Sequence, residues 1–373
     1  MNKLLEKRLL ALLNRRKAQK AFRSLHNSSH LIDFCSNDYL SLARSSELQE
    51  SVKEQDKNQQ LGATGSRLLS GHYELLDTLE EKLAQFHQAE AALVFNSGYT
   101  ANLGIISAIP RRSDLILYDA LIHASIHDGI RLSAAASRSF AHNNLAELEA
   151  LLIDNPQKTI FVIVESIYSM DGDAAPLLSM QRLCQKHEAN LIVDEAHSTG
   201  ICGENGAGLC VELGIEKAVF ARIHTFGKAI GTHGAAVLGS QLLKDYLINY
   251  ARPFIYTTAI SPHTTQSSLA AYQLLEKKGA LYIQELRERI AYFQEQISSQ
   301  NKYTYIKSNS PIQCLLVPGN EAVTQLSALL QKEGYDVRPI RTPTVPAGKE
   351  RIRICLHRHN SFEEIKKLIQ LLT

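Results

Sequence analysis

The middle of the chain alternates between short apolar runs and longer segments in which apolar residues recur every three or four positions. The first pattern predicts buried strands, and the second predicts helices that pack on one face. Strands are expected at 91–95, 115–118, 159–164, 191–193, 218–222 and 234–239. Helices are expected between them, for example at 75–86, 144–152 and 177–187. The alternation predicts an α/β fold with a mostly parallel central sheet flanked by helices.

The two ends of the chain follow other patterns. Residues 2–25 have the pattern of an amphipathic helix, and a short extended stretch follows at 31–34. From residue 262 a helical pattern continues to about 296, with an interruption near Gly279. A smaller α+β pattern ends the chain, with strands at 312–317 and 351–356 and helices at 321–332 and 361–372. We therefore predict three parts: an N-terminal helical arm with a short strand (1–45), a large ligand-binding α/β domain (46–260) and a small α+β domain (261–373).

Composition narrows the possible classes of function. Of the 373 residues, 45% are hydrophobic and 21% are charged, which is typical of a globular enzyme, and the net charge of +2 argues against nucleic-acid binding. The six cysteines form no CxxC pair, so reduced thiols are expected rather than disulfides or a metal site. No apolar run approaches the roughly 18 residues that cross a bilayer, and the N-terminus lacks a signal-peptide pattern. The expected location is the cytoplasm, without a membrane partner.

The N-terminal segment is nevertheless strongly basic. Within residues 1–26, lysines and arginines stand at 3, 7, 8, 15, 16, 17, 20 and 23, and the one acid is Glu6. Such a run is most often a solvated helix face. Its field could also attract phosphate groups or an acidic protein partner.

The candidate chemistry lies where strands end, because ligands of open α/β sheets bind beyond the carboxyl ends of the strands. Asp194 is the first charge after the strand 191–193, and Lys228 lies among small and apolar residues in 224–231. A lysine in this setting suits a Schiff base with the aldehyde of pyridoxal phosphate, and the aspartate suits the cofactor's ring nitrogen. The alternatives are a helix-capping or loop carboxylate and a solvated lysine.

Other polar residues suit contacts with the same cofactor. The segment 95–100 follows a strand and opens a helix, so its N–H groups and the hydroxyls of Ser97 or Thr100 could cradle a phosphate, although such turns are common without a ligand. His197 is placed to reach the ring hydroxyl, and Thr225 is placed to reach a phosphate oxygen.

His123 and Ser169 also follow predicted strands. An imidazole at 123 could stack on a pyridine ring, but a helix-cap or core histidine would show the same pattern. Ser169 could equally be a turn residue before the Asp-Gly-Asp of 171–173. Near the C-terminus, Arg351 and Arg353 point to one face of a strand. One of them could grip a carboxylate, and at least one should belong to a solvent-facing basic ladder.

Four motifs taken together resemble the α-oxoamine synthases, which are fold-type I pyridoxal phosphate enzymes. They are SNDYL at 36–40, SMDGD at 169–173, DEAHSTG at 194–200 and TFGK at 225–228. Each motif is moderately specific, whereas their order and spacing together are highly so. The resemblance extends from Arg15 to the last predicted helix. The run PTVPAG at 343–348 and the STG ending at 198–200 are similar to members that use L-alanine and a pimeloyl thioester.

The resemblance implies roles residue by residue. Lys228 would bind the cofactor covalently, Asp194 would pair with its ring nitrogen, and His197 would pair with its ring hydroxyl. His123 would stack on the ring and help to position the substrate. The implied cofactor-binding residues are Gly98, Tyr99, His123, Ser169, Asp194, His197, Thr225 and Lys228. Thr257 or Thr258 would reach the phosphate of the neighbouring subunit in a homodimer with shared active sites. Arg23, Thr344 and Arg353 would hold the substrate, with Arg353 on the amino-acid carboxylate.

The implied reaction is a decarboxylative condensation of L-alanine with pimeloyl-CoA or a pimeloyl carrier protein, in biotin synthesis. Its products are 8-amino-7-oxononanoate, carbon dioxide and a free thiol. A sibling enzyme that uses glycine and a short acyl-CoA, such as glycine C-acetyltransferase, is an alternative. An aminotransferase would share the fold and the Lys/Asp pair. A non-enzymatic cofactor-binding role would leave the assembled site unexplained.

Overall fold

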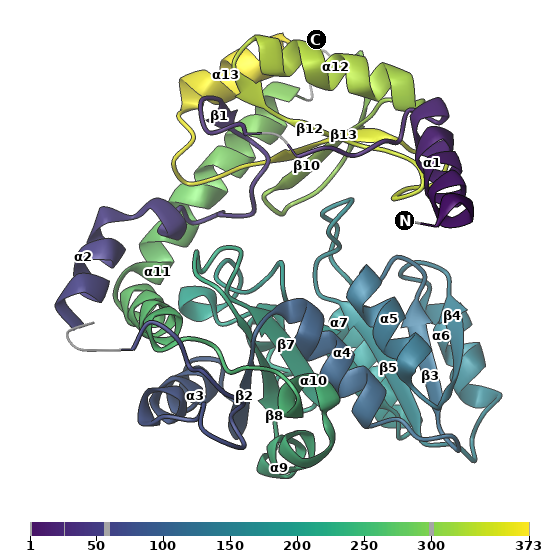
Figure 1. Ribbon diagram of the computed structural model, residues 1–373, viewed down its shortest axis with the longest axis vertical. Coiled ribbons are helices and arrows are strands. Elements are labelled where there is room, and N and C mark those ends of the chain that lie inside the picture. The colour runs from purple at the N-terminus through teal and green to yellow at the C-terminus, as the bar shows by residue number, and fades with distance from the viewer. Residues whose placement is uncertain (1, 26, 56–59, 298–301, 373) are drawn as a thin grey trace. The chain divides into compact units, whose positions relative to one another are not determined.

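The structure, a computed structural model, describes residues 2–25, 27–55, 60–297 and 302–372 (Figure 1). The chain divides into two compact units, each of which is described by itself. The large unit comprises Asn37–Ser169 and Ala174–Glu285. The small unit comprises Met1–Ser36, Met170–Asp173 and Leu286–Thr373. The three-part division expected from the sequence stays a prediction.

The large unit is built on a seven-stranded sheet with the order β2-β8-β7-β6-β5-β3-β4. Its strands are β2 (Ala91–Phe95), β3 (Leu115–Asp119), β4 (Ala136–Phe140), β5 (Ile160–Glu165), β6 (Asn190–Asp194), β7 (Ala221–Thr225) and β8 (Ala235–Gly239). The strands from β4 to β7 pair in parallel, whereas β8 is antiparallel to both β7 and β2. The mostly parallel central sheet expected from the sequence is confirmed.

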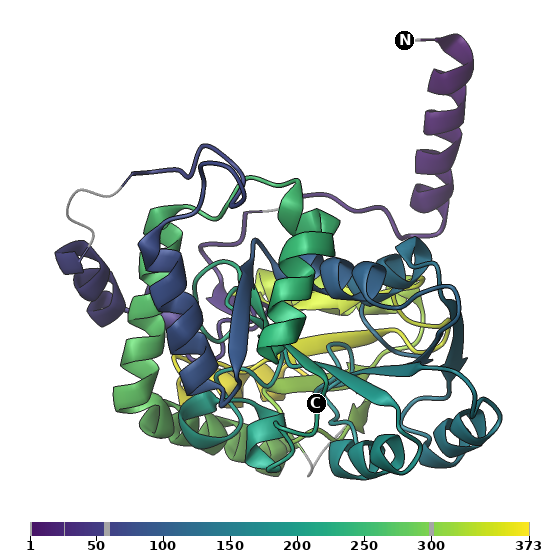
Figure 2. The same cartoon turned by 90° about the horizontal axis from the view of Figure 1, so that it is seen from below.

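Two apolar clusters cover the two faces of this sheet, because successive side chains of a strand point to opposite faces. Ile163 and Ile192 belong to the first cluster, and their neighbours Val162 and Val193 belong to the second. The first includes helices α4 (Gly98–Ala108), α5 (Ala124–Leu132), α9 (Gln241–Tyr250) and α10 (Arg252–Ile255). The second includes α6 (Leu145–Ile153), α7 (Leu177–Lys186) and α8 (Leu209–Glu212), and helices are visible on both faces in Figure 2. Strands covered on both sides explain the continuous apolar runs in the sequence.

Two strands of the large sheet differ from the sequence prediction. The strand β4 was not predicted, because Phe140 is its one buried residue and its other side chains are exposed. The strand expected at 218–222 instead runs over β7, Ala221–Thr225. The apolar residues Val219 and Phe220 lie in the bend before it. The prediction for β7 used apolar residues alone, and it therefore placed the start of the strand too early in the sequence.

The remaining helices of the large unit include α2 (Ser46–Gln55) and α3 (Glu74–Phe86). The long helix α11 (Pro262–Ile297) is continuous, so the interruption predicted near Gly279 is wrong. A Cβ atom added at Gly279 would lie 2.6–3.0 Å from backbone atoms of Asn205. The glycine is therefore explained by a close backbone approach and not by a break in the helix.

The small unit contains a four-stranded antiparallel sheet with the order β12-β13-β10-β9. Its strands are β9 (Thr304–Ile306), β10 (Ile312–Leu316), β12 (Arg338–Ile340) and β13 (Arg351–Cys355), with helices α12 (Asn320–Lys332) and α13 (Phe362–Gln370). The short strands β1 (Ile32–Asp33) and β11 (Tyr335–Asp336) pair in parallel.

The N-terminal helix α1 (Lys3–Ala18), purple in Figure 2, is shorter than the predicted 2–25. It ends because Lys20 adopts a positive φ of 51°, outside the helical region. None of the side chains over the described residues 3–18 is buried. Among the helices of the described ranges, none is long and apolar enough to cross a membrane.

Candidate active site

Three of the predicted residues meet beyond the carboxyl ends of the parallel strands β6 and β7. Asp194 is the last residue of β6, His197 lies in the turn after it, and Lys228 follows β7. The Lys228 Nζ atom lies 2.9 Å from Nε2 of His197. Asp194 is 5% exposed, and its Oδ2 accepts a 2.7 Å hydrogen bond from Asn102 Nδ2. The structure thus brings a lysine amine, an imidazole and a buried carboxylate to one end of the sheet.

The orientation of His197 is set by the segment that carries the SNDYL motif. The Tyr39 hydroxyl donates to Oδ1 of Asn37 at 3.0 Å, so its oxygen accepts from Nδ1–H of His197 at 2.8 Å. The His197 proton is then on Nδ1, and the Nε2 lone pair faces the Lys228 amine. The motif was recognised from the sequence, but this contact of Tyr39 was not predicted, because it joins residues 158 positions apart.

His123 is the N-cap of α5, and its Nδ1 accepts the backbone N–H of Ser125 at 3.2 Å. Desolvation lowers the pKa of His123 below its usual value, the charge of Asp194 opposes this, and the charge of Lys228 adds to it. The ring therefore lies within the field of both Asp194 and Lys228. The helix cap that the sequence left as an alternative is present, and it occupies only one of the two ring nitrogens.

A second carboxyl group, which the sequence analysis did not select, lies beside Asp194. Glu165 ends β5, and the strand register pairs it with Asp194 at the end of β6. The two residues are 3% and 5% exposed. Burial, and then the charge of Asp194, raise the pKa of Glu165 well above its usual value. Glu165 therefore holds its proton to a higher pH than an ordinary glutamate does. The sequence held a signal for Glu165, because Glu165, like Asp194, is an acidic residue at the end of an apolar strand.

The raised pKa of Glu165 predicts a stability effect in the protein without cofactor. Between its usual pKa and the raised one, the folded state binds more protons than the unfolded state, so the free energy of unfolding falls as pH rises. Glu165→Gln should remove this part of the pH dependence. Urea unfolding from pH 5 to pH 9 measures it, with the exposed Glu90→Gln as a control. Parallel curves for wild type and Glu165→Gln would contradict the buried neutral acid.

The start of α4 is the candidate phosphate site. The first backbone N–H groups of a helix lack partners within the helix, and here they belong to Gly98 and Tyr99. A Cβ atom at Gly98 would lie 3.5 Å from Thr225, so the glycine leaves room beside that threonine. The hydroxyls of Ser97 and Thr100 are used differently from the sequence interpretation, since they form a capping box with each other's backbone.

The other predicted cofactor residues, Thr257, Thr258 and Ser169, belong to the large unit. Asn96 Nδ2, just before α4, donates to the Thr258 carbonyl at 2.9 Å and approaches Thr257 Oγ1 at 3.4 Å. Both threonines thus lie beside the start of α4 in their own chain. Ser169 lies in the turn after β5 and is half-buried. Its contact with a cofactor, and that of the two threonines with a neighbouring subunit, stay predictions.

The predicted substrate residues lie in the small unit. Arg23 Nη2 donates to Thr344 Oγ1 at 3.2 Å, which brings these two together. Arg353 is half-buried, with Nη1 3.0 Å from Sγ of Cys355. Arg351 is 4% exposed and forms an ion pair with Asp171. The prediction that at least one of the two strand arginines faces solvent is therefore wrong, because an acid outside the strand pairs with Arg351 and neither arginine is exposed.

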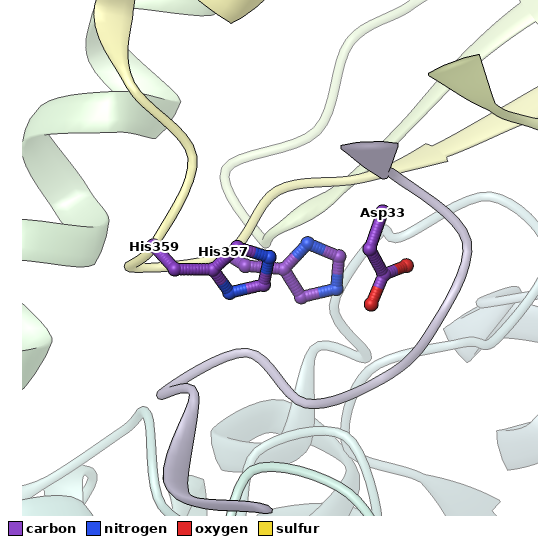
Figure 3. A group of neighbouring side chains, drawn as sticks. All are labelled: Asp33, His357 and His359. Carbon is purple, nitrogen blue, oxygen red and sulfur yellow. The ribbon is translucent and has the colours of Figure 1, made fainter. Parts of the chain in front are cut away.

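A separate cluster in the small unit has the residue types of a metal site but not the geometry. Ligand atoms of Asp33, His357 and His359 lie within 4.8 Å of one another (Figure 3). The two imidazoles stack with centroids 4.8 Å apart and planes 18° apart. The lone pair of a ring nitrogen lies in the plane of its ring, so two rings stacked face to face do not direct their lone pairs at one ion about 2.0–2.1 Å away. Both ring nitrogens of His357 also face oxygen atoms at 3.0 Å, on Ser36 and Asn360. The cluster is a hydrogen-bonded tie between β1 and the segment after β13.

The chain is similar to known proteins over most of its length. The model of the aminotransferase class I and II family matches residues 29–372. An 8-amino-7-oxononanoate synthase of Emericella nidulans is 41% identical over 92% of this chain and 88% of its own length. The enzyme of the same name from Marinobacter nauticus is 38% identical over 92% of this chain and 86% of its own length.

Solved structures of two enzymes superpose on most of this chain. A serine palmitoyltransferase from S. paucimobilis, with bound PLP-myriocin aldimine, superposes with a TM-score of 0.90 at 25% identity, covering 100% of this chain and 98% of that one. An 8-amino-7-oxononanoate synthase from Francisella tularensis superposes with a TM-score of 0.78 at 29% identity, covering 93% and 97% of the two chains.

The chain therefore belongs to the class I and II aminotransferase family, with the fold of the pyridoxal phosphate transferases. Within that family, it is similar over most of its length to α-oxoamine synthases that are called 8-amino-7-oxononanoate synthases, and it is a pyridoxal phosphate-dependent enzyme of the acyltransferase type. The family resemblance stated from the four sequence motifs is confirmed.

Proposed function

We propose that this enzyme condenses L-alanine with a pimeloyl thioester, carried by CoA or by a carrier protein. The products are 8-amino-7-oxononanoate, carbon dioxide and the free thiol, and the pathway is biotin synthesis. The observation that carries the proposal is the 2.9 Å contact of Lys228 with His197 beyond the carboxyl ends of β6 and β7, where Asp194 ends β6. The chain is also 41% identical to an 8-amino-7-oxononanoate synthase. A cytoplasmic homodimer with shared active sites, in which Thr257 or Thr258 reaches the partner's phosphate group, belongs to the same proposal.

Pyridoxal phosphate is the cofactor, and the residues of the site fit it. The Lys228 amine is available to its aldehyde, and the buried Asp194 carboxylate suits its ring nitrogen. The first N–H groups of α4, which begin at Gly98 beside Thr225, suit its phosphate group. The bound cofactor supplies an electron sink for negative charge on the substrate carbon next to the amine.

The residues around this sink have separate tasks. Lys228 takes the proton from the substrate Cα and later returns one. His197 faces the Lys228 amine with its Nε2 lone pair, so it orients the amine and can accept one of its protons. Asp194 keeps the ring nitrogen protonated, because a close pair of opposite charges is worth about 4 kcal/mol at an effective dielectric constant of 20. Its burial excludes the water that would weaken this interaction.

Substrate recognition is assigned to residues of the small unit. Arg353, on β13, takes the carboxylate of the amino acid through its paired N–H donors. Arg23 and Thr344, which are already hydrogen-bonded to each other, contact the remainder of the substrate. These assignments follow the family resemblance, and the Arg23–Thr344 contact supports them by bringing together two residues that are 321 positions apart.

The function is tested by offering alanine, glycine and serine in turn with acetyl-CoA and with pimeloyl-CoA or a pimeloyl carrier protein. Release of thiol and carbon dioxide should be fastest for alanine with a pimeloyl donor. Fastest turnover of glycine with acetyl-CoA would instead identify a sibling α-oxoamine synthase. Formation of pyridoxamine phosphate with the amino acid alone would identify an aminotransferase, since a synthase returns the cofactor as the aldehyde.

A further inference from the structure

Two buried polar residues, neither of which the sequence analysis selected, connect Asp194 with His123 in the large unit. Asn102 of α4 is 2% exposed, and Ser125 of α5 is fully buried. Asn102 Nδ2 lies 2.7 Å from Asp194 Oδ2 and 3.0 Å from Ser125 Oγ. Ser125 Oγ in turn lies 2.8 Å from Nδ1 of His123. The four side chains form one continuous run of hydrogen bonds from β6 through α4 to the start of α5.

The direction of each hydrogen bond follows from groups that can only donate or only accept. An ionised carboxylate only accepts, so the Asn102 amide must turn its NH₂ group toward Asp194. The same NH₂ group also donates to Ser125 Oγ. The backbone N–H of Ser125 donates to His123 Nδ1 at 3.2 Å, so this nitrogen presents a lone pair, and the Ser125 hydroxyl 2.8 Å away donates to it as well. Nδ1 therefore receives two donors and carries a lone pair, and the proton of the neutral ring is on Nε2.

We propose that Asn102 and Ser125 are positioning residues, which hold the Asp194 carboxylate in place and keep His123 as the neutral imidazole with its proton on Nε2. A proton on Nδ1 would displace the N–H and the O–H of Ser125 together, so the ring resists both the other tautomer and the charged form. The role of the Nε2–H group rests on the proposed function. In that function, His123 donates one hydrogen bond, with a fixed direction, to the bound substrate or cofactor.

The charges around His123 agree with this assignment. Asp194 on β6 raises the pKa of the ring, whereas Lys228 after β7 and His127 on α5 lower it. Glu165 on β5 accepts from the backbone N–H of His123, and its raised pKa favours its neutral form. Desolvation is the largest influence, and the net result is a pKa of His123 below its usual value. The hydrogen bonds and the charges thus both favour the uncharged ring.

The proposal is tested by nitrogen NMR of the full chain labelled with ¹⁵N-histidine, with and without pyridoxal phosphate. The shifts of the two ring nitrogens distinguish the two neutral tautomers and the charged form, and the signals of His123 are those lost in His123→Asn. Wild type should show the Nε2–H tautomer at neutral pH. In Asn102→Ala the Ser125 hydroxyl loses the donor that helps to orient it, so its hydrogen bond to Nδ1 weakens, while the backbone N–H of Ser125 stays in place. The share of the Nδ1–H tautomer should then increase, and the pKa of His123 should rise by about 0.5–1 pH unit, the effect of one weakened hydrogen bond.

The controls make the result specific. Ser107→Ala removes a hydroxyl from the same helix α4 that donates to the Leu103 carbonyl, and it should leave His123 unchanged. If Asn102→Ala does not fold, Ser125→Ala carries the test, because it removes one of the two donors from Nδ1 and must raise the same pKa. A wild-type His123 that is charged or protonated on Nδ1, or variants with an unchanged tautomer and pKa, would overturn the proposal. The tautomer is measured without any turnover, so failure to form 8-amino-7-oxononanoate would count against the proposed function alone.

Discussion

Lys228→Ala should lose turnover by at least about 10,000-fold, because the variant lacks both the covalent link to the cofactor and the general base. Borohydride should also trap no cofactor on the peptide that contains position 228. Thiol release measures the first effect, and mass spectrometry of the reduced protein measures the second.

Lys217→Ala is a suitable control, because Lys217 is an exposed lysine of the large unit. It should keep both the activity and the trapped cofactor. An active Lys228→Ala protein would refute the assignment of this amine, whereas an inactive protein that still traps cofactor on another lysine would separate binding from catalysis.

Asp194→Asn should lower kcat/KM by about 1,000-fold. The substitution keeps the shape of the side chain and removes one charge, and about 4 kcal/mol of charge interaction corresponds to three factors of ten. It should also lower the pKa of Glu165, because the charge of Asp194 is one of the causes that raise it. Steady-state kinetics measures the first effect, and the pH dependence of unfolding measures the second.

The exposed Asp245 offers the matched substitution, since Asp245→Asn on α9 changes the same charge far from the strand ends β6 and β7. Activity within a few-fold of wild type in Asp194→Asn would show that the ring nitrogen does not depend on this carboxylate. The proposed electron sink would then need another source of stabilisation.

The fold was predictable where the burial of an element produces a simple pattern in the sequence. Strands such as β5 and β6 are covered on both faces, and each appears in the sequence as an uninterrupted apolar run. The strand β4 lies at the sheet edge with mostly exposed side chains, so its composition resembles that of a loop. Gly279 was misinterpreted for a related reason, because a local pattern cannot show that the backbone of Asn205 lies against that point of α11.

The site was predictable where a residue interrupts such a run. Asp194 ends β6 and Lys228 follows β7, so their positions relative to the sheet were available from the sequence. Asn102 and Tyr39 act through partners 92 and 158 positions away, and no local pattern encodes those contacts. Asn102 did leave one trace, since it is a polar residue within the apolar helix α4. A buried amide in such a helix requires a partner, and the partner is Asp194.

His123 both caps helix α5 and carries an imidazole of the candidate site, and this affects how the residue should be probed by mutagenesis. Alanine at this position would remove the aromatic ring and also uncap α5, at a cost of about 1 kcal/mol. A defect in an alanine variant would thus mix lost chemistry with a frayed helix. Asparagine is itself a good N-terminal cap, so it keeps α5 intact while it deletes the imidazole. The choice of replacement therefore decides whether a kinetic defect at His123 can be attributed to the reaction.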